Sequence, residues 1–263
     1  MKTCLRMGAD MRLANEVAEK IERRLYDGIS TDKILRMIFL FMRKHKPSVR
    51  NLFDLRKGIS LMDSKPEFEM FVRALLEHSG FEVSPNQILI GKCVEHEVDA
   101  IARRKGATFF VEAKHHVGYH TLTGLDESRI ARAILEDVNE GYLVGKSNVK
   151  IDGAIIVTNT RYSEHARRYG ECIDILQIGW DTPFEDNLQS MIEKNRLYPL
   201  SCLRSLKHQY RMKLVTSGVV IMKQLFEEET SKLARRAAIP EEALRDVIEK
   251  AKISTDELWY SQI

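Results

Sequence analysis

Two pairs of charged residues, each spaced two apart, could place reactive groups on one surface. They are Glu97 with Asp99, and Glu112 with Lys114. The surrounding segments are rich in β-branched and aromatic residues and are separated by an Arg-Arg-Lys-Gly turn, which predicts an antiparallel pair of strands. Side chains two apart on a strand share a face, so Glu112 and Lys114 point the same way. We therefore expect Asp99, Glu112 and Lys114 to converge at one edge of a sheet.

Two carboxylates and an ammonium group suit hydrolysis of a phosphodiester bond. Carboxylate oxygens hold Mg²⁺, or Mn²⁺ in its place. The metal polarises the phosphate and lowers the pKa of a bound water, and the lysine stabilises the developing charge. A surface ion pair is the alternative interpretation of a Glu-x-Lys triplet. The apolar residues at 109–111 favour the catalytic interpretation, as does Glu69 on a preceding predicted helix.

A set of short motifs resembles the Mrr-like branch of the PD-(D/E)xK nucleases over roughly residues 66–180. The matching pieces are FEMFV at 68–72, LL at 75–76, GF at 80–81, HEVD at 96–99 and VEAK at 111–114. The resemblance implies a metal-dependent DNA endonuclease of restriction or repair type. It also implies an α/β fold, a restriction-endonuclease-like mixed sheet flanked by helices. Because two strands need two sites, it further implies a homodimer.

Site roles follow from the resemblance, residue by residue. Asp99 and Glu112 correspond to the metal ligands, Lys114 to the catalytic lysine and Glu69 to a helix glutamate that assists. Two further acidic-motif residues form a second tier, namely Glu97 and His96. Many members carry a glutamine on the next helix, whereas residues 115–121 have none and contain three histidines. Each histidine is open to two interpretations, a phosphate or metal contact or a structural hydrogen bond.

The elements that position these residues follow from the hydrophobic pattern. Apolar stripes predict helices at 66–78, 126–144 and 163–169, and β-rich runs predict strands at 81–83, 94–102, 108–115, 153–159 and 173–180. The run at 153–159 is continuously apolar, which favours a buried parallel strand. This order predicts a mixed sheet in a nuclease core at 66–198.

Residues 1–60 read as an amphipathic helical domain. A first helix at 13–26 is stopped by Gly28, and a second at 32–44 is capped by Ser30 or Thr31 and ended by Pro47. The segment resembles the latter part of an ATP-cone domain, which implies ATP as a ligand. The opening strands of that module would precede Met1, so we expect an incomplete module. The alternative is a helical bundle that packs on the nuclease core.

Residues 199–263 read as a helical domain of two or three short helices, broken at Gly218 and Pro240. The segment 213–225 resembles a helix-hairpin-helix or SAM-like repeat, with Gly218 at the turn. Such turns hold DNA phosphates or mediate protein contacts. Our candidates for contact with the DNA backbone are Arg161, Arg167, Arg168, Arg211, Lys213, Gly218 and Lys223.

The amino-acid composition excludes several other classes of protein. The 263 residues include 41 Lys and Arg against 38 Asp and Glu, and a low content of Pro and Gly argues against a disordered chain. Four cysteines without short spacing argue against a zinc site or a disulfide framework. No signal segment or long apolar run appears, so we expect a cytoplasmic protein without a membrane partner. A catalytically idle scaffold that binds DNA, or one regulated by a nucleotide, is the alternative to an endonuclease.

Overall fold

The computed structural model describes residues 1–6, 9–45 and 54–260 and divides the chain into two compact units. One unit is Leu55–Pro199, which contains the sheet, and the other combines Met1–Asp54 with Leu200–Ile263. The predicted nuclease core at 66–198 lies within the first unit. Most of the predicted domains 1–60 and 199–263 falls in the second unit, whereas residues 55–60 and residue 199 belong to the first.

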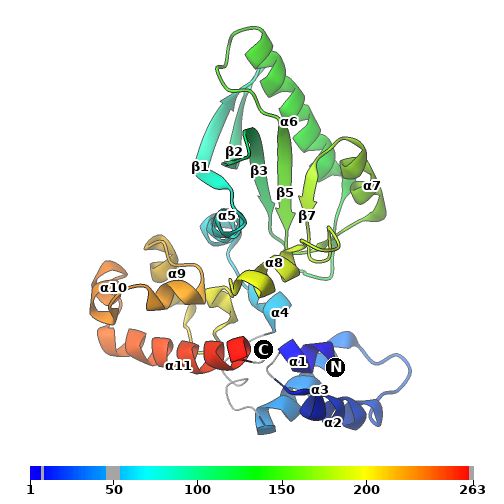
Figure 1. Cartoon of the computed structure of the whole chain (residues 1–263), viewed down its shortest axis with the longest axis vertical. Coiled ribbons are helices and arrows are strands. Elements are labelled where there is room, and N and C mark those ends of the chain that lie inside the picture. Colours follow the sequence, from blue (N-terminus) through cyan, green and yellow to red (C-terminus); the bar gives the residue numbers. More distant parts are fainter. Residues whose placement is uncertain (7–8, 46–53, 261–263) are drawn as a thin grey trace. The chain divides into compact units, whose positions relative to one another are not determined.

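The first unit is built on a five-stranded sheet in the order β1-β2-β3-β5-β7 (Figure 1). Strands β1, β2 and β3 pair antiparallel, whereas β3, β5 and β7 pair parallel, which confirms the predicted mixed sheet. A separate parallel pair joins β4 to β6. The strands are β1 Glu82–Ile90, β2 Glu95–Arg104, β3 Ala107–Lys114, β4 Leu122–Thr123, β5 Gly153–Thr158, β6 Arg161–Tyr162 and β7 Leu176–Ile178.

Local sequence explains the centre of this sheet. All six residues of β5 are buried, as expected for a continuous apolar run covered on both faces. The turn between β2 and β3 has positive φ at Lys105 and Gly106, 52° and 81°, the conformation that lets a two-residue hairpin match the strand twist. The predicted antiparallel pair is therefore confirmed.

Helices cover the sheet. Helix α5 contacts β1 and β2, α6 contacts β1 and β5, and α7 contacts β7. On the α6 side, Phe110, Ile156 and Val138 are fully buried in one hydrophobic cluster. The helices of this unit are α4 Leu55–Ser60, α5 Glu69–His78, α6 Leu125–Leu143, α7 Glu164–Cys172 and α8 Leu188–Asn195.

Among the element boundaries that differ from the prediction, three have a structural cause. Helix α5 begins at Glu69, because residues 64–68 form a separate π-helical turn, η2 Ser64–Phe68, in which Lys65 is extended. Strand β1 has nine residues where three were expected, because pairing with β2 stabilises segments of weak local preference. Strand β7 is shorter than expected, since Asp174 adopts a left-handed φ of 56° just before it.

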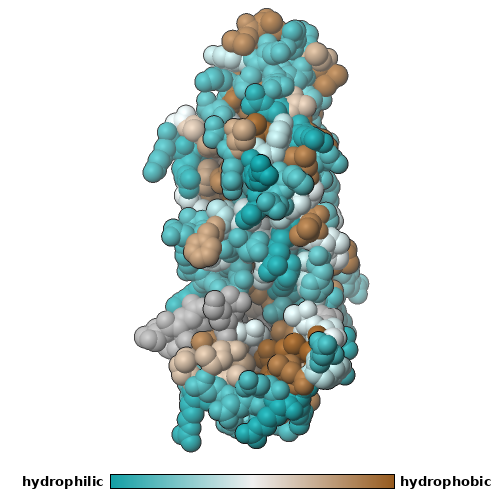
Figure 2. Space-filling view, turned by 90° about the vertical axis from the view of Figure 1, so that its right-hand side faces the viewer, coloured by the Kyte–Doolittle hydropathy of each residue, from teal (hydrophilic) through white to brown (hydrophobic). Residues whose placement is uncertain are grey.

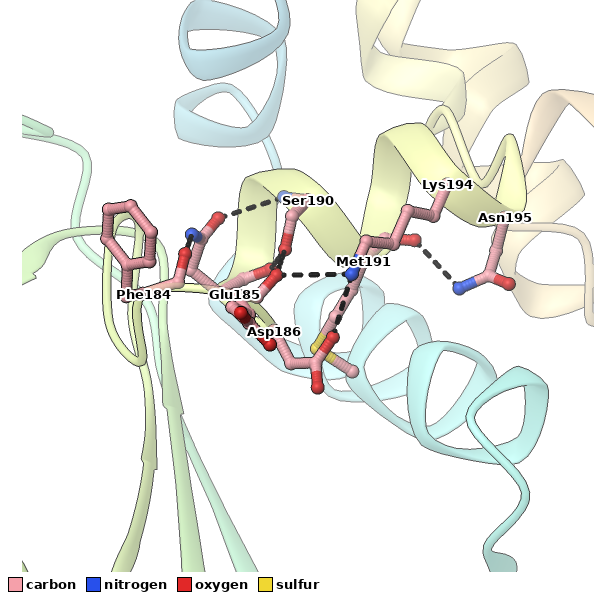
Figure 3. A network of polar contacts seen from close by, with 8 residues as sticks. Phe184, Glu185, Asp186, Ser190, Met191, Lys194 and Asn195 are labelled. Carbon is pink, nitrogen blue, oxygen red and sulfur yellow. Dashed lines mark hydrogen bonds and ion pairs between the residues drawn. The ribbon is translucent and has the colours of Figure 1, made fainter.

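The loop that enters α8 is held by side chains (Figure 3). Asn187 caps the helix by accepting from Ser190 N at 2.9 Å and donates to Phe184 O at 2.9 Å. Ser190 Oγ donates to Glu185 O at 2.6 Å. The ring of Phe184 points away from α8 and is 93% exposed. The loop is thus ordered although its aromatic ring has no packing role.

The second unit is helical. Helices α1, α2 and α3 share one hydrophobic cluster that includes Val17 and Met42, and Ser30 Oγ accepts from Lys33 N at 3.3 Å as a cap. The predicted stop at Pro47 lies outside the described residues. The last helix has 20 residues and is not one of the short helices that we predict. The elements are α1 Lys2–Arg6, α2 Met11–Glu22, α3 Thr31–His45, η3 Leu200–Cys202, α9 His208–Thr216, η4 Met222–Phe226, α10 Thr230–Arg236 and α11 Glu241–Tyr260.

The surface in Figure 2 is largely hydrophilic, with separate apolar areas. Leu143, at the end of α6, is 80% exposed. Within the described ranges, no helix combines the length and the apolar character that a membrane span requires.

Candidate active site

Asp99 and Glu112 lie where strands β2 and β3 separate. The last paired residues are Ala100 and Val111, so Asp99 and Glu112 stand one position beyond them in the same register. Asp99 Oδ2 accepts a hydrogen bond of 2.7 Å from the backbone N–H of Ala113. The carboxylate thereby satisfies a backbone donor that has left the ladder, and it is fixed beside the Glu112–Lys114 segment.

Helix α5 holds strand β2 at this point. Asn86 lies opposite Asp99 on β1 and has a left-handed φ of 41°. Arg73 on α5 donates to Asn86 Oδ1 at 2.9 Å and to the carbonyl of Asp99 at 3.3 Å. One guanidinium group therefore ties the helix to both strands at the residue that carries the carboxylate.

Glu112 and Lys114 emerge from the core on the face that Phe110 occupies. Lys114 Nζ lies 3.3 Å from Glu112 Oε2 and 3.3 Å from Glu127 Oε2 on α6. Burial raises the pKa of Glu112, the Lys114 ammonium opposes that effect, and the Asp99 charge adds to it, so the pKa stays above its ordinary value. Burial lowers the pKa of Lys114, but Glu112 and Glu127 more than offset this, so that pKa is raised.

Glu127 was not predicted as a site residue. It lies in the first turn of α6, where the helix dipole favours an acidic residue. The sequence pattern alone therefore gives it an ordinary structural explanation. Its contact with Lys114 adds the role of holding the Lys114 ammonium group, which lies between the carboxylates of Glu112 and Glu127.

Glu69 joins the site from the first turn of α5. Its residue is only 6% exposed, and burial raises its pKa while Lys65 opposes that effect. Lys65 Nζ lies 3.0 Å from Glu69 Oε1 and 3.6 Å from Asp99 Oδ1. The carboxylates of Glu69 and Asp99 thus both lie close to the ammonium group of Lys65. Lys65, which the sequence motifs do not mark, belongs to the same cluster.

His115 has a structural role. Its Nε2 lies 3.0 Å from the carbonyl of Ile59, and its Nδ1 lies 3.3 Å from Ser64 Oγ. Because a carbonyl can only accept, Nε2 carries the proton and Nδ1 accepts from Ser64. Burial lowers the pKa of His115, in agreement with a neutral ring. His116 contacts Thr123 Oγ1 at 3.3 Å.

The second-tier residues, His96 and Glu97, are neighbours on β2, so their side chains point to opposite faces of the sheet. His96 Nε2 is 2.8 Å from Asp137 Oδ2 on α6, and Asp137 also accepts from the N–H groups of Cys93 and Val94. These bonds hold the pKa of Asp137 well below its ordinary range and fix the loop between β1 and β2. Glu97 is exposed, and its charge contributes to the raised pKa of Lys65.

The predicted DNA contacts in the sheet unit are accessible. Arg167 and Arg168 are exposed on α7, and Arg161 is 55% exposed while paired with Asp181 at 2.9 Å.

The predicted contacts in the helical unit differ in accessibility. Lys223 is exposed, whereas Arg211 is 7% exposed and presents little surface to a phosphate. Lys213 Nζ donates to Ala238 O at 2.6 Å. Gly218, with φ of 86°, ends α9 by donating its N–H to Val215 O. Its N–H is thus already used within the chain.

The donor set fits an open site for a hard cation. Within the residues that the structure describes, no three His, Cys, Asp or Glu side chains form a metal-holding group. Asp99 and Glu112 offer carboxylate oxygens, and Mg²⁺ commonly keeps several waters and is held by one or two carboxylates and substrate phosphates. The residues therefore suit Mg²⁺ or Mn²⁺, and they lack the sulfur and nitrogen ligands of a structural zinc site.

The mixed sheet and the acidic residues at its diverging strands define a restriction-endonuclease-like domain. A family model described as a restriction endonuclease matches residues 59–177. An uncharacterized protein of Archaeoglobus fulgidus is 33% identical over 178 residues, which is 68% of this chain and 96% of that protein. A crystal structure of a protein of unknown function is 30% identical with a TM-score of 0.63, covering 77% of this chain and 99% of that chain. Residues 59–177 therefore form a domain of the restriction endonuclease family, and the chain is a relative of the uncharacterized Archaeoglobus protein. The ATP-cone and helix-hairpin-helix resemblances, with ATP binding, stay predictions.

Proposed function

We propose that this protein is a metal-dependent DNA endonuclease that hydrolyses phosphodiester bonds, of restriction or repair type. The observation that carries the proposal is the convergence of Lys114 with Glu112, and of Asp99 with the backbone of Ala113, in a domain of the restriction endonuclease family. Raised pKa values at Glu69 and Glu112 support it, because carboxylates are kept in disfavoured surroundings mainly where function requires them.

Each residue has a role in this proposal. Asp99 and Glu112 would hold the divalent cation, which would supply Lewis-acid polarisation of the phosphate and a water of lowered pKa. Lys114 donates to a non-bridging phosphate oxygen and stabilises its growing negative charge. Glu127 orients the Lys114 ammonium group, and Glu69 accepts a hydrogen bond from the attacking water and so orients its lone pair toward the phosphorus.

Cleavage of plasmid DNA tests this proposal. We expect the wild-type protein to nick plasmid with Mg²⁺ or Mn²⁺ and not with EDTA. Lys114→Ala reduces the rate by roughly 10²–10³, as expected for removing one preorganised charge donor. Lys150→Ala is the matched control, because Lys150 is an exposed lysine paired with Asp152 at 3.2 Å. We expect this variant to keep full activity. Equal nicking by Lys114→Ala, or nicking in EDTA, contradicts the proposal.

DNA binding is tested separately by its salt dependence. Arg167 and Arg168 are neighbouring, exposed cations on α7. If both contact phosphates, Arg167→Ala and Arg168→Ala each weaken binding uniformly across sequences and lower the salt slope by about one. Arg211→Ala is expected to leave the slope unchanged, because Arg211 is buried. A slope that Arg167→Ala and Arg168→Ala leave unaltered excludes α7 from the DNA interface.

The alternative function is a catalytically idle scaffold that binds DNA, with or without nucleotide regulation. The lysine between Glu69 and Asp99 favours it, because a cation is already present at the carboxylates. A gel shift in EDTA, together with no cleavage under any metal, supports this alternative. Calorimetric titration with ATP tests the nucleotide prediction for residues 1–60, and absence of heat removes it.

A further inference from the structure

Lys65 lies against the carboxylates of the candidate site. Its ammonium nitrogen is 3.0 Å from Glu69 Oε1 and 3.6 Å from Asp99 Oδ1. The charge of Glu97 also acts on it. An acidic cluster of this kind repels itself unless a cation is present, and one lysine supplies that cation.

The backbone around Lys65 is fixed on both sides. Ser64 Oγ donates to His115 Nδ1 at 3.3 Å, which ties the segment to the residue after Lys114. The buried carboxylate of Glu67 accepts from Asp63 N at 2.9 Å. Lys65 itself is extended, with φ of −130° and ψ of 136°. The position of its Cα relative to the site is therefore set by the fold.

The side chain of Lys65, in contrast, has room to leave. It is 69% exposed, whereas the side chains of Glu69 and Asp99 are 7% and 15% exposed. The two carboxylates are held by the protein, and the ammonium group reaches them from the solvent side on a flexible stem.

We propose that Lys65 is the internal counter-ion of the carboxylate site, which offsets part of the negative charge of Glu69 and Asp99 before a divalent cation binds and is displaced when it binds. This inference rests on the proposed function, in which Asp99 and Glu112 hold the cation. An ammonium group and a divalent cation repel each other at such short range. The fold thus sets a threshold for metal binding, because the cation must outcompete a tethered one.

Calorimetric titration of the full chain with Mn²⁺, without DNA, tests this inference. Lys65→Met keeps an unbranched side chain one atom shorter and removes the charge. We expect it to bind Mn²⁺ about tenfold more tightly, which corresponds to about 1.4 kcal/mol. Lys65→Arg keeps the charge and binds like the wild type. Lys150→Met is the control for a distant exposed lysine and also binds like the wild type.

A second readout covers any change in folding. The melting temperature of each variant is measured in EDTA and with Mn²⁺. The increase produced by Mn²⁺ is expected to be larger in Lys65→Met than in the wild type, because tighter binding to the folded state gives more stabilisation. This comparison is made within each variant, so a lower starting stability does not affect it.

The outcomes separate the two proposals. If Glu112→Gln abolishes Mn²⁺ binding but Lys65→Met binds no more tightly than the wild type, the counter-ion inference is overturned and the proposed metal ligands stand. If the wild type does not bind Mn²⁺, or Glu112→Gln binds it equally well, the metal role in the proposed function fails, and the inference fails with it.

Discussion

The carboxylate of Asp99 accepts the backbone N–H of Ala113 at 2.7 Å, so the acidic residue of β2 is bonded to the residue between Glu112 and Lys114 on β3. The bond replaces the ladder pairing that ends at Ala100 and Val111. The same hydrogen bond therefore marks where β2 and β3 separate and fixes the position of the Asp99 carboxylate.

This bond predicts a difference between two variants of Asp99. Asp99→Asn keeps an acceptor for Ala113 but loses the charge, so we expect a stable and inactive protein. Asp99→Ala also leaves the Ala113 donor without its partner, which costs about 1–3 kcal/mol more. Urea denaturation in EDTA measures the difference, and equal stability of the two variants would show that the bond contributes nothing.

Glu127 is predicted to be a positioning residue. Glu127→Ala frees one side of the Lys114 ammonium group and is expected to lower kcat about tenfold with KM unchanged, because the charge donor is less well oriented. Glu127→Gln retains an oxygen acceptor and restores most of the rate. Steady-state cleavage assays measure both, and a failure of Gln to rescue would argue against orientation through a hydrogen bond.

Glu112→Gln is expected to raise the melting temperature of the metal-free protein. Burial raises the pKa of Glu112, so its ionised form is less favourable in the folded protein than in the unfolded chain. The neutral amide removes that cost. Differential scanning calorimetry in EDTA measures the change, and a lower melting temperature would mean that the ion pair with Lys114 outweighs burial.

Asp137→Asn is expected to lower stability in a pH-dependent manner. The folded-state pKa of Asp137 lies below the ordinary value of 3.8, so its contribution is present above that value and is lost as the pH falls toward the folded-state pKa. The melting temperature of the variant should therefore lie furthest below that of the wild type at neutral pH, and the difference should become smaller in acid.

The neighbouring Glu136 provides the control for this series. It forms an exposed pair with Arg132, which contributes little to stability. Glu136→Gln should leave the melting temperature nearly unchanged. A gap for Asp137→Asn that is constant with pH would show that its carboxylate charge is not the stabilising feature.

In the loop before α8, we expect substitutions of Asn187 and Phe184 to differ in their effect on stability. Asn187→Ala removes the helix cap and the bond to Phe184 O, and should destabilise the protein by about 1 kcal/mol. Phe184→Ala should leave stability unchanged, because that side chain is almost fully exposed. Chemical denaturation compares them, and a destabilised Phe184→Ala would reveal packing in solution that this structure lacks.

Local chemistry determined much of the sheet. The alternating β-rich segments and the Lys105–Gly106 turn specify the β2–β3 hairpin, and the hairpin puts Glu112 and Lys114 on one face. The apolar run of β5 specifies a buried central strand. These features are readable because they depend on neighbours in the chain, and the family motifs are carried by the same residues.

Tertiary structure decided the partners of those residues. Lys65 reaches Asp99, Glu127 reaches Lys114, and Arg73 reaches the carbonyl of Asp99, each from a helix or turn packed beside the sheet. It also buried Arg211, which sequence alone marks as an accessible cation. No spacing encodes such contacts, because they depend on how helices pack on the sheet. The sequence by itself therefore determined the strands and their reactive residues, and packing determined the charges that surround them.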